Sequence, residues 1–334
     1  MTETGFWTVG EIECRLFRRH PVILFVNFTS TGIPRLAITG ALRMKNMVRR
    51  LLSIAGLEVS RIDRVRWSQM AEHYYPVNFQ PRYGHGRPSH PQIKALLEAE
   101  IDNYRTLLND FQRYRKYFSS VSMDATSVSA PFWNNDWFSS LDAAALMYFI
   151  ISRQPKEYIE VGSGFSTKFA RLAISSGSSQ TTLTSIDPHP RSEIDEICTE
   201  IIRSPLEDLD VSLFDRLKKG DIAFFDGSHR IFTNSDTTAF FMDVLPRLKS
   251  GVLVHIHDIF WPDDYTPQWN KRLYSEQYVL GGMMLGGLSK LKVVLPNYFV
   301  SMDQRTAPLI ANLGIPTRYA GTTNPGLSFW LEVQ

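Results

Sequence analysis

The sequence has few cysteines, almost no net charge and no long apolar run. Its two cysteines, Cys14 and Cys198, are too few and too far apart for a disulfide framework or a thiolate metal site, which fits a reducing cytoplasm. A net charge of +2 without a basic stripe argues against a nucleic-acid partner. No run approaches the roughly 18 apolar residues that a membrane-spanning helix needs, so we expect a cytoplasmic protein.

Residues 1–60 differ in character from the rest and are predicted to be a poorly ordered N-terminal extension. The stretch 44–52 reads as a basic amphipathic helix that starts at a methionine, so we expect residues 1–43 to be dispensable. Residues 47–66 combine five arginines with aliphatic side chains. Such a segment can make a peripheral contact with an anionic membrane surface, or it can be a solvated helix face.

Residues 61–139 are predicted to form a helical cap or an oligomerisation region. Ser89-x-x-Gln92, with Pro91 between, has the pattern of a capping box at a helix start. Apolar residues then recur at three- and four-residue steps, as in an amphipathic helix: Ile93, Leu96, Leu97, Ile101, Tyr104, Leu108, Phe111 and Tyr114. We expect this apolar face to pack either against the main domain or against a second subunit in a homo-oligomer.

Residues 140–334 alternate between short apolar runs and helical patterns. This order predicts a Rossmann-like α/β fold, with a mostly parallel seven-stranded sheet and helices on both faces. We expect strands at 158–161, 182–186, 200–203, 221–225, 252–256, 290–295 and 327–333. The main helices are expected at 140–152, 167–175 and 237–248.

The segment 160–167, Glu-Val-Gly-Ser-Gly-Phe-Ser-Thr, encodes a strand end, a tight turn and a helix start. Gly162 and Gly164 permit positive φ and close backbone approach. A loop of this kind after the first strand of an open α/β sheet usually holds a nucleotide-like ligand. A dinucleotide fingerprint would need a third glycine where Thr167 stands. Asp187, at the end of the next strand, can accept both hydrogen bonds from a ribose diol.

Four segments together resemble the class I S-adenosylmethionine-dependent methyltransferases, and more narrowly the bacterial branch similar to cephalosporin-type and macrolide-sugar O-methyltransferases. They are 160–167, Ser185-Ile186-Asp187-Pro188, 221–229 and His255-Ile256-His257-Asp258. The resemblance covers about 130–334 and implies that residues 140–334 are an S-adenosylmethionine-binding catalytic domain. It assigns the cofactor, S-adenosyl-L-methionine, to Glu160, Gly162, Ser163, Gly164, Thr167, Asp187, Asp208 and Asp226.

Polar residues at two further strand ends are candidates for the chemistry. Asp226 ends the expected fourth strand, and His257-Asp258 end the fifth. Adjacent strands lie about 4.8 Å apart, so Asp226, His257 and Asp258 can form a divalent-metal site. The similar enzymes carry two acids in place of His257-Asp258, which leaves Mg²⁺, Mn²⁺, Fe²⁺ and no metal as alternatives. In those enzymes the position of His229 supplies the general base, and an imidazole with a reference pKa near 6.5 can accept a proton at neutral pH.

Aromatic residues indicate where an acceptor molecule would bind. The segment Trp261-Pro262-Asp263-Asp264-Tyr265 and Trp269 are expected to form a lid over the metal. The aromatic segment 131–137 either lines a pocket or packs in the core. Such surfaces suit a small-molecule or glycan acceptor, namely a sugar, a glycan precursor or a secondary metabolite. We therefore expect an O-methyltransferase, with a metal-independent methyltransferase and a non-catalytic S-adenosylmethionine-binding module as alternatives.

Overall fold

The computed structural model describes two strands near the N-terminus and residues 80–334, apart from 178–179, 270–271, 289, 317, 320–321 and 324. The chain divides into two compact units, Met1–Asn78 and Phe79–Gln334. In the first unit, β1 (Ile12–Leu16) pairs antiparallel with β2 (Leu57–Arg61). The predictions for residues 1–43 and 47–66 otherwise lie outside the described residues.

A seven-stranded sheet forms the centre of the second unit, in the order β5-β4-β3-β6-β7-β11-β8. Its strands are β3 (Glu157–Val161), β4 (Thr182–Ile186), β5 (Glu200–Ile202), β6 (Ile222–Phe225), β7 (Leu253–Ile256), β8 (Leu291–Pro296) and β11 (Phe329–Val333). Within this sheet β11 runs antiparallel to both neighbours, and the pairs among β3 to β7 are parallel. Every residue of β6 and β7 is buried, because both faces of the sheet are covered. The predicted Rossmann-like sheet is confirmed.

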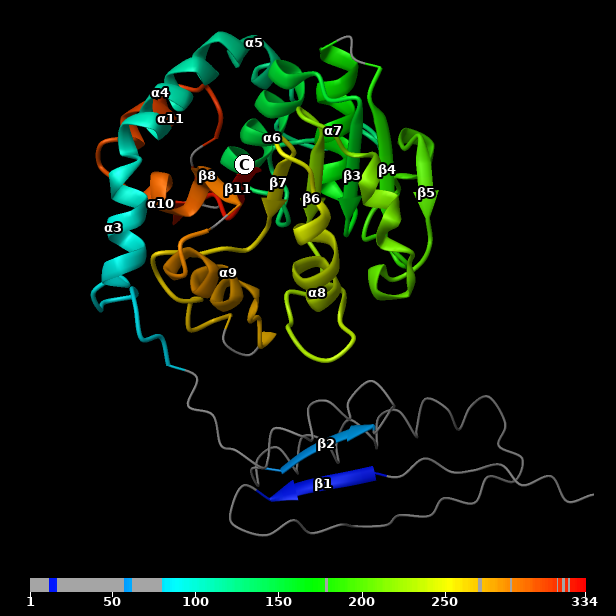
Figure 1. Cartoon of the computed structure of the whole chain (residues 1–334), viewed down its shortest axis with the longest axis vertical. Helices are drawn as coiled ribbons and strands as arrows, with labels where there is room; N and C mark the ends of the chain where they lie inside the picture. Colours follow the sequence, from blue (N-terminus) through cyan, green and yellow to red (C-terminus); the bar gives the residue numbers. More distant parts are fainter. Residues whose placement is uncertain are drawn as a thin grey trace, which may run out of the picture. The chain divides into compact units, whose positions relative to one another are not determined.

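Short helices connect and cover the strands (Figure 1). The longer ones are α6 (Ser140–Arg153), α7 (Phe165–Ser176) and α9 (Glu276–Leu285), followed by α10 (Asn297–Met302) and α11 (Ala307–Ala311). Short 3₁₀-helices lie at η4 (Asp195–Ile197), η5 (Leu206–Asp208) and η6 (Val211–Arg216), and β9 (Arg318–Tyr319) pairs with β10 (Thr322–Thr323). Among the described residues, no helix is long and apolar enough to cross a membrane.

The helix predicted at 237–248 is broken into three pieces. It starts as α8 (Asp236–Ala239), widens into a π-helical turn at η7 (Phe240–Val244), and tightens into a 3₁₀ turn at η8 (Leu245–Arg247). Pro246 gives the physical reason, since it has no backbone N–H to donate and its ring clashes with the carbonyl four residues earlier. A regular α-helix therefore cannot continue through this segment.

The predicted amphipathic helix forms as α3 (Pro91–Ala99) and α4 (Ile101–Phe111), which meet at Glu100. Pro91 occupies the first turn as expected, but the N-cap is His90, whose side chain accepts the N–H of Ile93, so the predicted capping box at Ser89 was wrong. Turns η3 (Gln112–Tyr114) and α5 (Arg115–Phe118) follow.

The apolar face of α3 and α4 is buried within the same unit at Ile93, Leu97, Ile101, Tyr104, Leu108 and Phe111, and α4 contacts α11 beside the β8 edge of the sheet (Figure 1). Of the two predicted partners for this face, the structure shows the main domain. Residues 80–139 thus belong to the same compact unit as the sheet. The boundary between the two compact units falls after Asn78.

Candidate active site

The turn after β3 is built around a close backbone approach. Gly162 has φ +79°, and a Cβ atom there would lie 1.8 Å from the carbonyl oxygen of Asp226. The N–H of Gly162 donates to Ile186 O at 3.0 Å, and the N–H of Asp226 donates to Val161 O at 2.9 Å. Only glycine satisfies both the left-handed conformation and the contact with the end of β6. The turn is therefore fixed between the ends of β4 and β6.

Side chains hold the rest of the turn in place. The Asp187 carboxylate accepts the N–H of Ser163 at 2.8 Å and, through its other oxygen, the N–H of His189 at 2.7 Å. Thr167 Oγ1 accepts the N–H of Gly164 at 2.9 Å. Glu160 is fully buried and accepts a hydrogen bond from the Ser166 hydroxyl. Burial raises the pKa of Glu160 to about 8, so its carboxyl is largely protonated at neutral pH.

A cavity of about 430 Å³ lies against this turn. Of the predicted cofactor residues, Gly162, Ser163, Asp187 and Asp226 line it. Glu160 and Thr167 are buried and lie outside its lining, where they support the turn. At η5 the cavity is lined by Leu206 and Glu207, whereas Asp208 is exposed and outside the lining.

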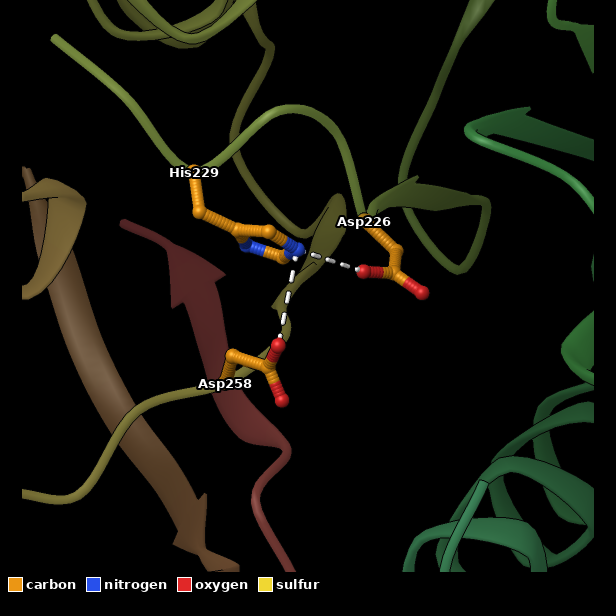
Figure 2. Close-up of side chains that lie close together, drawn as sticks. All are labelled: Asp226, His229 and Asp258. Atoms are coloured by element: carbon orange, nitrogen blue, oxygen red, sulfur yellow. Dashed lines mark ion pairs between the residues drawn. The ribbon is translucent and has the colours of Figure 1, made fainter. Parts of the chain in front are cut away.

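At the ends of β6 and β7, one imidazole lies between two carboxylates (Figure 2). His229 Nε2 is 3.2 Å from Asp226 Oδ1 and 3.5 Å from Asp258 Oδ2. His229 and Asp258 both have left-handed backbone conformations, with φ of 62° and 58°. Non-glycine residues rarely adopt this conformation, and such strain clusters at functional sites. Here it accompanies the meeting of three side chains from two strand ends.

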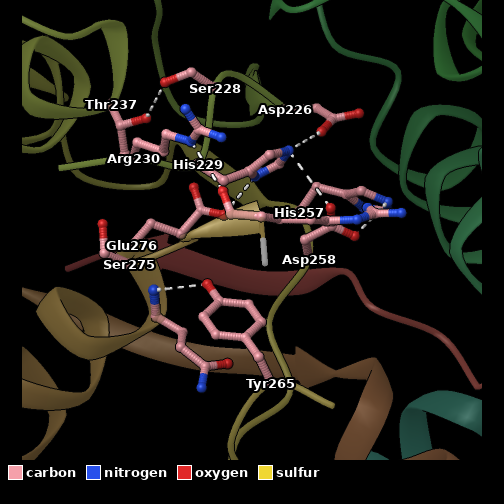
Figure 3. Close-up of polar contacts among 12 residues, drawn as sticks. Asp226, Ser228, His229, Arg230, Thr237, His257, Asp258, Tyr265, Ser275 and Glu276 are labelled. Atoms are coloured by element: carbon pink, nitrogen blue, oxygen red, sulfur yellow. Dashed lines mark hydrogen bonds and ion pairs between the residues drawn. The ribbon is translucent and has the colours of Figure 1, made fainter. Parts of the chain in front are cut away.

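Glu276, at the start of α9, holds the opposite side of the same ring (Figure 3). Its Oε1 lies 2.5 Å from His229 Nδ1, and its side chain is fully buried. The carboxylate accepts the Nδ1 proton, which leaves Nε2 directed at Asp226 and Asp258. The N–H of Ser275 also donates to His229 O at 2.8 Å, and the Tyr274 ring lies 4.3 Å from the imidazole. The segment 274–276 therefore fixes the position of His229 and the partner of its Nδ1.

The charges around His229 change its proton affinity. Burial alone would lower the pKa of His229, but the carboxylates of Glu276, Asp226 and Asp258 outweigh burial and raise this pKa well above 6.5. Burial raises the pKa of Glu276 to about 7, although His229 opposes this rise. Burial also raises the pKa of Asp258. The site as it stands favours a protonated imidazole among acidic groups.

The group with metal-ligand geometry differs from the predicted one. Ligand atoms of Asp226, His229 and Asp258 all lie within 4.8 Å of one another. His257, which was expected there, has its Nε2 3.6 Å from Asp258 Oδ1, and its ring packs against Phe138. The structure thus places the imidazole of His229 in this group, with that of His257 beside it.

A second cavity, of about 620 Å³, is also lined by Asp226. His257 and Asp258 line it as well. The rest of its lining includes aromatic and basic side chains, namely Trp137, Trp269, Tyr274, Arg191, Arg230 and Arg272. The two cavities share Asp226 and Arg191, so a molecule in each would meet at Asp226.

The two aromatic segments divide between packing and lining. In 131–137, Trp133 packs against Phe169, while Trp137 is 59% exposed and lines the second cavity. The predicted lid is wrong for Trp261 and Tyr265, which are both buried in the fold. Asp264 accepts the N–H of Tyr83, which explains why this part of the loop is anchored. Trp269 does line the cavity as expected.

Comparison with known proteins matches the segment that holds the glycine turn and the polar residues at the ends of β6 and β7. Residues 159–259 match the family model described as "Methyltransferase domain". These residues form a methyltransferase domain. A curated relative, an uncharacterized protein of Archaeoglobus fulgidus, is 32% identical over 112 residues, which are 32% of this chain and 48% of that protein. The chain spans about half the length of this curated relative.

Three solved structures were found to be similar to this chain over about three quarters of its length. The O-methyltransferase from Bacillus cereus in complex with SAH has 12% identity and a TM-score of 0.36, covering 73% of this chain and 99% of that chain. The SAH-bound Podospora anserina methyltransferase PaMTH1 has 10% identity and a TM-score of 0.35, covering 75% and 100%. The plantazolicin methyltransferase BpumL, in complex with a pentazolic desmethylPZN analog and SAH, has 16% identity and a TM-score of 0.37, covering 73% and 99%.

The sequence did not predict two arrangements in this site. Glu276 lies 47 residues from His229, beyond the matched segment, and no local pattern links them. Arg230 and Arg272 were not predicted to share a wall with the catalytic candidates. The available signal was weak: Arg272 and Glu276 follow the aromatic loop closely in the sequence.

Proposed function

We propose that the protein is an S-adenosylmethionine-dependent O-methyltransferase that methylates a hydroxyl of a sugar, a glycan precursor or a secondary metabolite. The observation that carries the proposal is the pair of cavities that meet at Asp226. One cavity is lined by the glycine turn and Asp187, which suits an adenosine-containing donor. The other is lined by aromatic and polar side chains, which suits an oxygen-rich acceptor.

The donor cavity offers partners for the ribose and the adenine of S-adenosylmethionine. Asp187 retains lone pairs for the ribose hydroxyls beside the backbone N–H groups that it already accepts. Leu206 and Glu207 lie where an adenine ring would be covered. The bound cofactor supplies an electrophilic methyl group on sulfur.

His229 is the proposed general base. A neutral alcohol is a poor nucleophile, so removal of its proton accelerates attack on the methyl group. The hydrogen bond to Glu276 keeps Nε2 of His229 directed between Asp226 and Asp258. Both of these carboxylates line the acceptor cavity. The raised pKa of His229 means that the neutral, base-competent form is favoured by higher pH or by neutralisation of the surrounding carboxylates.

The donor set also fits a divalent cation. Two carboxylates and an imidazole within 4.8 Å suit Mn²⁺ or Fe²⁺, and Mg²⁺ when water completes its coordination. Asp226 and Asp258 would hold it, with Nε2 of His229 or the neighbouring His257 as the nitrogen donor. Such an ion would acidify a bound hydroxyl. One Nε2 lone pair cannot both bind a metal and accept a proton, so the two roles of His229 are separable.

His229→Ala tests the base. We expect the variant to bind S-adenosylhomocysteine like the wild type, measured by calorimetry, and to lose turnover by about 100-fold or more in an assay of S-adenosylhomocysteine release. Turnover at the wild-type rate would remove His229 from the mechanism. Metal affinity of the same variant, measured by Mn²⁺ titration, separates the roles: a base leaves it unchanged, whereas a ligand lowers it.

A melting panel with Mg²⁺, Mn²⁺ and a chelator tests the metal. A bound ion raises the melting temperature through its binding free energy. Wild-type turnover that survives the chelator, without any metal-dependent shift in melting, would leave the metal-independent form of the same reaction.

A further inference from the structure

The acceptor cavity has a basic wall that the methyl transfer itself does not require. Arg230 and Arg272 line this cavity and not the donor cavity. Arg230 Nε donates to the Arg272 carbonyl oxygen at 2.9 Å, which fixes the two residues side by side. The Arg272 guanidinium lies 3.9 Å from the ring centre of Trp269 and 5.6 Å from that of Tyr274. Stacking of this kind occupies the face of the guanidinium and leaves its N–H edge free.

The Arg272 charge acts on Asp258, but the two residues are not within ion-pair distance of each other. Among the residues that the structure describes, neither Arg230 nor Arg272 forms an ion pair with a carboxylate. Three of the four carboxylates that line the cavity have other partners. Asp142 accepts the N–H groups of Leu327 and Ser328, and Asp226 and Asp258 face His229. The fourth, Asp136, is exposed and is not in an ion pair with either arginine in the described part of the chain.

We propose that Arg230 and Arg272 form an anion subsite, and that the acceptor is a hydroxyl-bearing ring that carries a carboxylate, phosphate or sulfate group. This inference rests on the proposed methyltransferase function and names its substrate class. Guanidinium groups bind such anions through paired, charge-assisted hydrogen bonds. Arg230 directly follows His229 in the chain, so the anion would be held next to the hydroxyl to be methylated. Trp269 and Tyr274 would then face the ring of the acceptor.

Separate observations exclude the methyl donor as the source of the anion. The carboxylate of S-adenosylmethionine would lie in the donor cavity, whose lining includes Arg191 but neither Arg230 nor Arg272. Loss of the two arginines should therefore change acceptor binding and leave donor binding unchanged.

The test compares matched probes on the full chain saturated with S-adenosylhomocysteine. The probes are 4-nitrophenyl β-D-glucuronide, the 6-phosphate and 6-sulfate of 4-nitrophenyl β-D-glucoside, and the neutral glucoside itself. We expect at least one anionic probe to bind about 10-fold more tightly than the neutral glucoside by calorimetry, and the strongest of the three identifies the anion. The preference should shrink as salt is raised.

Variants separate this subsite from general charge. The double variant Arg230→Gln, Arg272→Gln should lose the anion preference, while Arg87→Gln, which removes an exposed arginine outside both cavities, should keep it. Equal affinity of all four probes for the wild type, or no detectable binding of any, overturns the proposal. Retention of the preference in the double variant also overturns it. S-adenosylhomocysteine affinity is measured on every sample. A wild-type chain that does not bind S-adenosylhomocysteine would refute the methyltransferase proposal and not the anion subsite.

Discussion

In the proposed mechanism Glu276 would act through His229, because it is hydrogen-bonded to Nδ1 and lines neither cavity. Glu276→Gln keeps the volume but weakens this hydrogen bond and allows the other tautomer. We expect kcat to fall by about 10- to 100-fold with an unchanged KM for S-adenosylmethionine. Glu276→Asp should restore part of the rate, because it retains the charge. Glu98→Gln, at a partly exposed residue of α3 outside both cavities, is the control, and equal kcat values for the control and Glu276→Gln would contradict the positioning role.

Glu160 links stability to pH. Burial raises its pKa from 4.5 to about 8. Between these two values the native carboxyl keeps its proton while the unfolded chain releases it, so stability is greatest below pH 4.5 and falls as pH rises through 8. Glu160→Gln cannot ionise. The free energy of unfolding, measured by urea titration, should fall between pH 5 and pH 8. We expect this fall to be smaller in the variant than in the wild type, by on the order of 3 kcal/mol. Equal losses in the two proteins would refute this role, and a drop in S-adenosylhomocysteine affinity would show that Glu160 contacts the cofactor.

At the scale of elements, the β3–α7 turn depends on one glycine. Gly162→Ala would combine a φ of +79° with a Cβ atom 1.8 Å from the Asp226 carbonyl oxygen, so β6 and the turn must separate. We expect the free energy of unfolding to fall by about 3 kcal/mol or more. We also expect the variant to lose S-adenosylhomocysteine binding. Gly220→Ala is the matched control, since its φ is +93° but nothing lies within 4 Å of the added Cβ. That variant should lose only about 1 kcal/mol and should bind normally. Melting and calorimetry measure both, and similar losses in the two variants would show that strain alone decides.

The elements that the sequence predicted well are those determined by local pattern. The strand at 182–186 was predicted with its observed ends, because a short branched run between turn residues is a local signal. The segment 237–248 was predicted as one continuous helix, because the helical spacing of its apolar residues was given more weight than Pro246. The start of α3 was misplaced by one residue, because His90 can accept the same N–H as a serine.

The site was predictable only where strand ends bring residues together. Parallel strands align their carboxyl ends, so the approach of Asp226 to Asp258 follows from the strand order. Glu276 and the Arg230–Arg272 pair come from a loop and helix whose path depends on tertiary packing. Nothing local in the sequence predicts that Asp264 anchors the loop after β7, or that Trp261 is buried while Trp269 lines a cavity.

At the scale of the whole molecule, the division after Asn78 predicts an independent catalytic unit. Every strand of the seven-stranded sheet, the buried faces of α3 and α4, and all residues that line the two cavities belong to Phe79–Gln334. A chain that begins at Phe79 should therefore unfold cooperatively, with a melting temperature within about 4 °C of the full chain. Its S-adenosylhomocysteine affinity should agree within about 2-fold by calorimetry, because the shortened chain keeps every described residue that lines the donor cavity. A deletion of residues 1–43 alone serves as the control. Loss of cooperative melting in both would mean that the N-terminal unit stabilises the sheet, whereas loss of turnover with intact melting and binding would assign the N-terminal unit a role in acceptor recognition.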